Sequence, residues 1–225
     1  MLLSGGMDSA TCLALARKES GPLHALTLTY GQRHRKEIRA ARSLARHYHV
    51  DRHVVVDLPS EPFADSALTD RRRSLPRSGP GKSGRIPSTY VPARNTVFLA
   101  MALGYAESHR LRRIFLGANA VDYSGYPDCR PEYLAAFRRL ARLATRVAVE
   151  SGESIDIVAP LLRLSKPEIV RLGSRLKVPW EKTWSCYAGG RYPCGVCDAC
   201  RLRSFGFLRA GAGDPLERSP RGSPR

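Results

Sequence analysis

The loop SGGMDS at positions 4–9 limits the possible folds of this sequence more than any other feature. It follows a short apolar stretch and opens a segment with helical periodicity that runs to Lys18. A strand joined to a helix through glycines is a βα unit, and the backbone N–H groups at the start of its helix attract anions. Glycines also let the backbone approach oxygen atoms closely. We therefore expect a phosphate-binding site at the head of the chain.

Strand and helix patterns alternate after this loop. Strands are expected at 24–30, 53–58, 113–117 and 155–159, and helices at 36–47, 96–108, 131–151 and from 165 onward. The alternation predicts an α/β fold with a doubly wound parallel sheet, whose carboxyl edge carries the loop. Residues 71–84 are rich in Arg, Ser, Pro and Gly, so we expect either a lid or a disordered insertion there.

The residue types of the loop indicate separate roles. Gly5 and Gly6 allow close backbone approach, Ser4 and Ser9 offer hydroxyl groups, and Asp8 is expected to hold Mg²⁺ or to fix the loop. The lysine of the GxxxxGK[ST] pattern is absent, which disfavours an ordinary nucleotide hydrolase. We assign catalysis to Ser4, Asp8 and Ser9. The predicted ATP contacts form one run, Leu3, Ser4, Gly5, Gly6, Met7, Asp8, Ser9, Ala10, Thr11, Cys12 and Leu13.

Four of the six cysteines lie close together in the sequence. Cys186, Cys194, Cys197 and Cys200 form the pattern CxxxxxxxCxxCxxC, and four thiolates so spaced can close a tetrahedral shell around Zn²⁺. Such a shell leaves no open position, so the metal is expected to be structural. The alternatives are a redox pair of cysteines and an iron–sulfur cluster. A brown protein that absorbs at roughly 400 nm would favour the iron–sulfur cluster.

The charge of the chain is strongly positive, with a formal net charge of +17, and 31 of the 37 basic residues are arginines. Such a surface attracts polyanions, but arginines are spread throughout the sequence, which is typical of solvated helix faces. We therefore do not expect nucleic acid to be required. The apolar windows fall short of the roughly 20 residues of a membrane span. We expect a soluble, cytoplasmic protein without membrane contacts.

Several stretches of the sequence resemble a known family. They are LSGGMDSAT at 3–11, YGQRHRKEI at 30–38, VPARN at 91–95, GANAVDYSGYPDCRPEY at 117–133, SCY at 185–187 and CGVCDACRLR at 194–203. In these the chain is similar to the 7-cyano-7-deazaguanine synthases of queuosine precursor biosynthesis, which are members of the ATP-pyrophosphatase or PP-loop superfamily with a Rossmann-like fold. The resemblance implies zinc held by four cysteines at the positions above, and a homodimer.

The resemblance also implies a reaction, in which 7-carboxy-7-deazaguanine, ammonia and ATP give the nitrile. Transfer of AMP to the carboxylate oxygen would make a good leaving group, ammonia would give an amide, and a second activation of the same oxygen would give the nitrile. The loop would stabilise the departing pyrophosphate. The alternatives are a tRNA-thiolating PP-loop adenylase and a zinc-knuckle RNA-binding module. The clustered cysteines argue against the first, and the phosphate loop argues against the second.

A polar run after the expected strand at 113–117 is the candidate substrate site. Taken alone, it is typical of a polar turn around Gly125 and Pro127. With the resemblance, its carboxylates could accept from a guanine-like amine, its tyrosines could stack and an arginine could hold the substrate carboxylate. The candidate residues are Arg94, Asn119, Asp122, Tyr126, Asp128 and Arg130.

The expected organisation has three parts. Residues 1–183 form an ATP-binding α/β domain, and residues 184–209 form a zinc-binding segment packed on it. Residues 210–225, rich in Gly, Pro, Ser and Arg, are expected to be a disordered tail. Near Arg94, Asn95 could cap the helix that follows it.

Overall fold

A twisted parallel sheet forms the centre of the protein, shown by a computed structural model that describes residues 1–19, 21–77, 86–119 and 125–217. Its strands are β1 (His24–Thr29), β2 (Arg52–Asp57), β3 (Arg113–Phe115) and β4 (Asp156–Val158), with β1 paired to β2 and β3 paired to β4. The Leu3 N–H donates to the Leu26 carbonyl and the Leu2 N–H donates to the Phe115 carbonyl, so residues 1–3 join the two pairs. The order β2, β1, residues 1–3, β3, β4 confirms the predicted doubly wound sheet.

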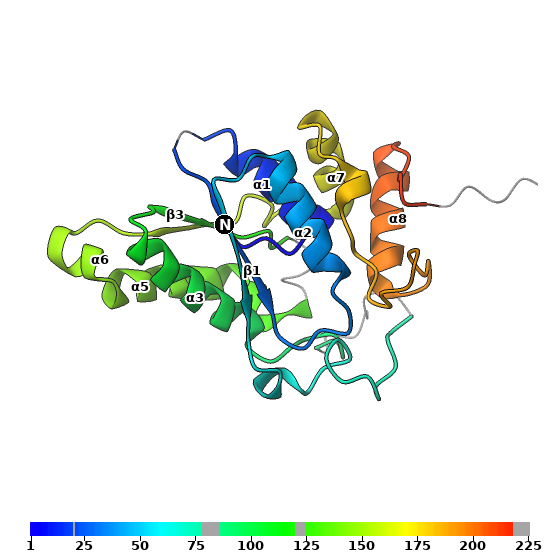
Figure 1. Cartoon of the computed structure of the whole chain (residues 1–225), viewed down its shortest axis with the longest axis horizontal. Coiled ribbons are helices and arrows are strands. Elements are labelled where there is room, and N and C mark those ends of the chain that lie inside the picture. The colour runs from blue at the N-terminus through cyan, green and yellow to red at the C-terminus, as the bar shows by residue number, and fades with distance from the viewer. Residues whose placement is uncertain (20, 78–85, 120–124, 218–225) are drawn as a thin grey trace, which may run out of the picture.

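Helices cover both faces of this sheet (Figure 1). Leu13, Leu44, Ile169 and Phe207 form a core on one face, and Leu99 packs with other apolar residues on the opposite face. Successive residues of a strand point to opposite sides of the sheet, so the strands contribute side chains to both cores. The helices are α1 (Met7–Ala16), α2 (Lys36–His47), α3 (Arg94–Ser108), α5 (Pro131–Ala144), α6 (Arg146–Ser151), α7 (Lys166–Arg175) and α8 (Asp198–Ala210), with short 3-10 helices η1 (Glu61–Phe63), η2 (Pro127–Cys129) and η3 (Trp180–Lys182).

The expectation of a single helix at 131–151 is wrong, because the helix is interrupted at Thr145. Thr145 is extended, with φ −111° and ψ 140°, and separates α5 from α6. Its hydroxyl donates to the Ala141 carbonyl at 2.8 Å. The Glu107 carboxylate accepts the N–H groups of Arg146 and Val147, so α3 supplies the acceptor that starts α6.

The start of α3 also differs from the expectation. Asn95 lies inside the helix rather than at its cap, and Ala93 precedes the helix in the left-handed region with φ 49°. The Asp128 carboxylate accepts the Asn95 N–H at 2.9 Å and so performs the capping role from a distant segment. This contact fixes the position of Arg94, the first residue of α3.

The C-terminal segment is part of the main body. Helix α8 packs on α7, and Phe207 contacts the Trp180 ring edge-on with 5.4 Å between the centroids. The Arg203 guanidinium is buried and donates to the Asp214 carboxylate at 2.7 and 2.9 Å. Asp214 belongs to the stretch expected to be disordered, and this ion pair holds it against α8. Residues 218–225 of that stretch lie outside the described residues.

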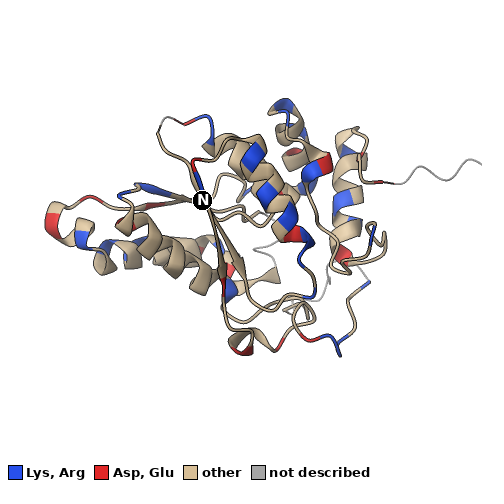
Figure 2. Ribbon diagram, viewed as in Figure 1, with Lys and Arg blue, Asp and Glu red and all other residues tan. Residues whose placement is uncertain are grey.

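Basic residues are distributed over several helices rather than confined to a single element (Figure 2). Along the described ranges, no helix combines the length and the apolar character needed to cross a bilayer.

Candidate active site

An open cavity lies at the carboxyl edge of the sheet. Its volume is ≈ 340 Å³. Ligand pockets usually measure about 300–1,000 Å³, so this space is of the size that binds small molecules. Its walls include the phosphate loop, the ends of β1 and β3, the first turns of α2, α3 and α7, and part of α8.

The phosphate loop is built around Gly5. Gly5 has φ +85°, and a Cβ there would lie 2.3 Å from the Glu37 carbonyl oxygen, so only glycine fits. The Ser9 hydroxyl accepts the Gly5 N–H at 3.1 Å and lies 3.0 Å from the Ser4 hydroxyl. Gly6 precedes α1 without a side-chain cap, which leaves the start of that helix available to an anion. The predicted strand–loop–helix arrangement is confirmed.

A lysine from far along the chain completes this site. The Lys166 ammonium donates to Asp8 Oδ2 at 2.6 Å across a sequence separation of 158 residues, and the Asn119 amide donates to the same oxygen at 3.2 Å. The Lys166 side chain and the serines of the loop therefore line the cavity. Oδ1 of Asp8 is buried and has no hydrogen-bond partner among the described residues.

Sequence reasoning missed Lys166, because the loop itself lacks a lysine. Lys166 is the first residue of α7 and lies between Ser165 and Glu168, which form the capping box of that helix. The Glu168 carboxylate accepts the Ser165 N–H at 2.8 Å, which fixes the start of the helix. The sequence did carry a signal for Lys166, which is a lysine at the start of a helix that follows a strand. Such a position lies at the carboxyl edge of the sheet, where ligands bind.

Apart from Gly5, the expected run of ATP contacts divides into two groups. Leu3, Ser4, Gly6, Met7, Asp8 and Ser9 line the cavity. Ala10, Thr11, Cys12 and Leu13 are buried within α1 and face the core. Burial raises the pKa of the Cys12 thiol to about 12, so this cysteine is protonated and packed at neutral pH.

Charged and aromatic side chains form another wall of the cavity. Arg94 donates to the Tyr30 hydroxyl at 3.1 Å, and its guanidinium lies 5.6 Å from the centre of the Tyr30 ring. Tyr126 also lines the cavity and stacks on Tyr90 with 6.1 Å between the centroids. Glu37, which the sequence reasoning did not single out, lies on the same wall in the first turn of α2.

The predicted substrate residues are not all brought together. Arg94 and Tyr126 line the cavity, and Asn119 contacts Asp8 beside it. Asp128 is buried at the start of α3, and Arg130 is exposed before α5. Asp122 lies outside the described residues.

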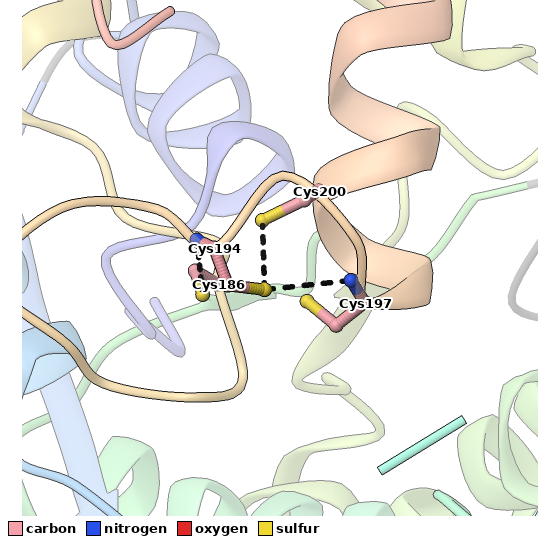
Figure 3. Close-up of side chains that lie close together, drawn as sticks. All are labelled: Cys186, Cys194, Cys197 and Cys200. Carbon is pink, nitrogen blue, oxygen red and sulfur yellow. Dashed lines mark hydrogen bonds between the residues drawn. The ribbon is translucent and has the colours of Figure 1, made fainter. Parts of the chain in front are cut away.

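The four cysteines form a compact cluster (Figure 3). All four Sγ atoms lie within 4.8 Å of one another, and those of Cys194 and Cys200 are 3.9 Å apart. Two ligands of a tetrahedral zinc at about 2.3 Å would be separated by roughly 3.8 Å, so the arrangement fits a metal ion. The N–H groups of Cys194 and Cys197 donate to cluster sulfurs at 3.3 and 3.4 Å. The cluster can therefore bind a metal, as predicted.

The cysteine segment also touches the phosphate loop. The Trp184 N–H donates to the Gly5 carbonyl at 2.9 Å, and its indole N–H donates to the Cys186 carbonyl at 2.9 Å. The His34 imidazole lies 2.8 Å from that same carbonyl, and the Lys36 ammonium lies 4.3 Å from the centre of the Trp184 ring. The residues before α2 therefore bind the cysteine segment beside the loop.

Comparison with known proteins agrees with this arrangement. The family described as "Queuosine biosynthesis protein QueC" matches residues 1–211. A 7-cyano-7-deazaguanine synthase of Nostoc punctiforme is 50% identical over 96% of this chain and 97% of its own length. One from Stutzerimonas stutzeri is 54% identical over 96% of this chain and 95% of its own.

A solved structure shares the fold. The NMN synthetase from Francisella tularensis covers 98% of this chain and 88% of its own, with a TM-score of 0.50 and 18% sequence identity. At that identity the likeness concerns the fold alone, which agrees with the doubly wound sheet. The family match over nearly the whole chain and the half-identical relatives show that the chain belongs to the QueC family of queuosine biosynthesis proteins.

Proposed function

We propose that this chain is a 7-cyano-7-deazaguanine synthase, which converts 7-carboxy-7-deazaguanine and ammonia to the nitrile with ATP. The observation that carries the proposal is the phosphate loop and Lys166 meeting in one large cavity of a chain that belongs to the QueC family. The half-identical relatives bear this enzyme's name.

The nucleotide phosphates are assigned to the loop and Lys166. The N–H groups at the start of α1 face an anion, and the Lys166 ammonium neutralises charge that develops on the leaving pyrophosphate. Mg²⁺ is assigned to Asp8, because its Oδ1 is buried and lacks a hydrogen-bond partner within the described part of the chain. A carboxylate oxygen is a ligand that Mg²⁺ prefers, and the bound ion would supply further charge neutralisation.

The reaction follows from activation of one oxygen at a time. The substrate carboxylate attacks the α-phosphorus of ATP, pyrophosphate leaves, and AMP becomes the leaving group on carbon. Ammonia displaces it to give an amide, and a second ATP activates the amide oxygen in the same way. The chain's own contribution is positioning and charge neutralisation by the loop, Asp8 and Lys166.

The deazaguanine is assigned to the wall that contains Arg94 and Tyr126. The Arg94 guanidinium has a buried Nε without a hydrogen-bond partner among the described residues, so it retains donor capacity toward a carboxylate. Tyr126 offers an aromatic face beside Tyr90. Asn119 is assigned to the junction between nucleotide and substrate, because it contacts Asp8.

Zinc is the proposed occupant of the cysteine cluster, with Cys186, Cys194, Cys197 and Cys200 as ligands. Four sulfur ligands complete its shell, so the ion would hold the segment beside the loop and take no part in the chemistry. The proposal also includes a cytoplasmic homodimer. Leu143 and Val149 support the dimer, since they are 81% and 73% exposed on the neighbouring helices α5 and α6.

The test is an assay of the purified protein with 7-carboxy-7-deazaguanine, ATP, Mg²⁺ and ammonia. The nitrile is followed by mass spectrometry, with reactions lacking one component as controls. Formation of the nitrile that depends on all four components is the expected result. Absence of product, together with ATP consumption that depends on tRNA, would instead favour a tRNA-modifying enzyme.

A further inference from the structure

Glu37 is held at a fixed place beside the phosphate loop. It is the second residue of α2 and lines the cavity. Gly5 packs against the same turn, because a Cβ at Gly5 would lie 2.3 Å from the Glu37 carbonyl and 2.7 Å from the Ala41 nitrogen. The side chain of Glu37 therefore enters the cavity from a helix turn whose backbone touches the loop.

The carboxylate of Glu37 is not used to hold the fold together. In the described part of the chain it makes no hydrogen bond and no ion pair within 4.0 Å. By contrast, the Asp8 carboxylate accepts hydrogen bonds from Lys166 and Asn119. The third carboxylate of the cavity, Asp198, is the first residue of α8. Glu37 is thus a cavity carboxylate with free acceptor capacity.

The environment of Glu37 makes it suitable for proton transfer near neutral pH. Burial raises its pKa to about 7, although the Arg94 charge favours the ionised form and the Cys186 charge opposes it. The other charged groups that line the cavity are Asp8 on α1, Lys166 on α7, and Asp198 and Arg203 on α8. A base with a pKa near the working pH is the most effective proton acceptor.

We propose that Glu37 is the catalytic base that removes protons from nitrogen as the carboxylate becomes a nitrile, an inference that rests on the proposed function. The nitrogen of ammonia must lose all three protons. No other step of the proposed reaction needs a base, because each oxygen attacks phosphorus as an anion or as an amide oxygen.

The proton losses follow the bond changes. In amide formation the C–N bond forms, the C–O bond to AMP breaks with its electron pair, and the nitrogen gives one proton to Glu37. When the amide oxygen bonds to phosphorus and pyrophosphate leaves, the nitrogen gives a second proton to Glu37. In the last step the C–O bond breaks, AMP leaves, the third proton passes to Glu37 and the C≡N bond is completed. The open cavity lets the Glu37 carboxyl return each proton to solvent.

The test separates activation of the carboxylate from chemistry at nitrogen. In Glu37→Gln we expect carboxylate-dependent exchange of pyrophosphate into ATP to stay within a few-fold of wild type, while nitrile formation falls about 10²–10⁴-fold. Glu37→Asp should retain part of the nitrile-forming rate. Glu132→Gln, an exposed residue of α5, is the matched control and should behave as wild type.

The pH profile gives a second measurement. With ammonia held in saturating excess at each pH, the wild-type rate of nitrile formation should fall below about pH 7, where Glu37 becomes protonated, and Glu37→Gln should lack this limb. Loss of exchange together with nitrile formation in Glu37→Gln would overturn the proposal, as would an unchanged nitrile rate. A wild-type protein that forms no nitrile would overturn the proposed function itself, and the Glu37 proposal with it.

Discussion

The cysteine cluster and the phosphate site were assembled from the chain in opposite ways. The four cysteines lie between residues 186 and 200, and their sulfurs are gathered within 4.8 Å by local turns. The phosphate site instead combines a loop at residues 4–9 with Asn119 and Lys166, which are 111 and 158 residues from Asp8. A site made of sequence neighbours can be recognised from spacing, whereas a site made by distant segments depends on the fold.

The two regions nevertheless touch. Trp184 hydrogen bonds to the Gly5 carbonyl and to the Cys186 carbonyl, so one residue lies between the cysteine cluster and the phosphate loop. The contrast between a local and an assembled site can be tested by changing one without the other.

The largest expected effect is on the assembled site. Lys166→Met removes the cation assigned to the phosphates, so nitrile formation should fall by about 10²–10³-fold while the bound metal stays at the wild-type level. Steady-state rates and elemental analysis measure the two quantities. Lys18→Met, which changes an exposed lysine after α1, is the control. Loss of metal in Lys166→Met would show that the two sites are not separable.

The converse change is aimed at the local site. Cys197→Ser should abolish stoichiometric metal and lower the thermal midpoint, because the cluster loses a ligand and the segment beside Gly5 loses its anchor. Cys12→Ala is the control, since Cys12 lies in the core and should leave the metal content unchanged. Full metal content in Cys197→Ser would exclude Cys197 as a ligand.

An intermediate effect is expected where the C-terminal segment joins the body. Asp214→Ala leaves the buried Arg203 guanidinium without its carboxylate, which should cost about 3–5 kcal/mol of the free energy of unfolding in urea titrations. Glu150→Ala breaks an exposed pair with Arg146 and should change little. Equal effects of the two changes would mean that Asp214 does not hold this segment in solution.

The smallest effect is expected at the helix that presents Lys166. Ser165→Ala removes the side chain of the capping box and should cost about 1 kcal/mol of stability. Nitrile formation should fall only a few-fold, because packing of α7 against α1 and α8 still positions the helix. A loss as large as that of Lys166→Met would show that the capping box, rather than tertiary packing, positions the lysine.

Much of the architecture could be predicted because it depends on local patterns. Alternating apolar segments predicted the parallel sheet and the start of α7 near residue 165. The break at Thr145 was not predictable from periodicity, because the acceptor that starts α6 is Glu107 of another helix. The cap of α3 was misassigned to Asn95 for the same reason, since Asp128 supplies it.

The sequence by itself determined the phosphate loop, the cysteine cluster and the alternation of strands and helices, because each depends on residues that are close together in the chain. Only the tertiary structure decided that Lys166 meets Asp8, that Arg94 and Glu37 share one wall, and that the cysteine segment touches Gly5. The physical reason is that a parallel sheet collects the carboxyl ends of distant strands at one edge, where side chains far apart in sequence converge.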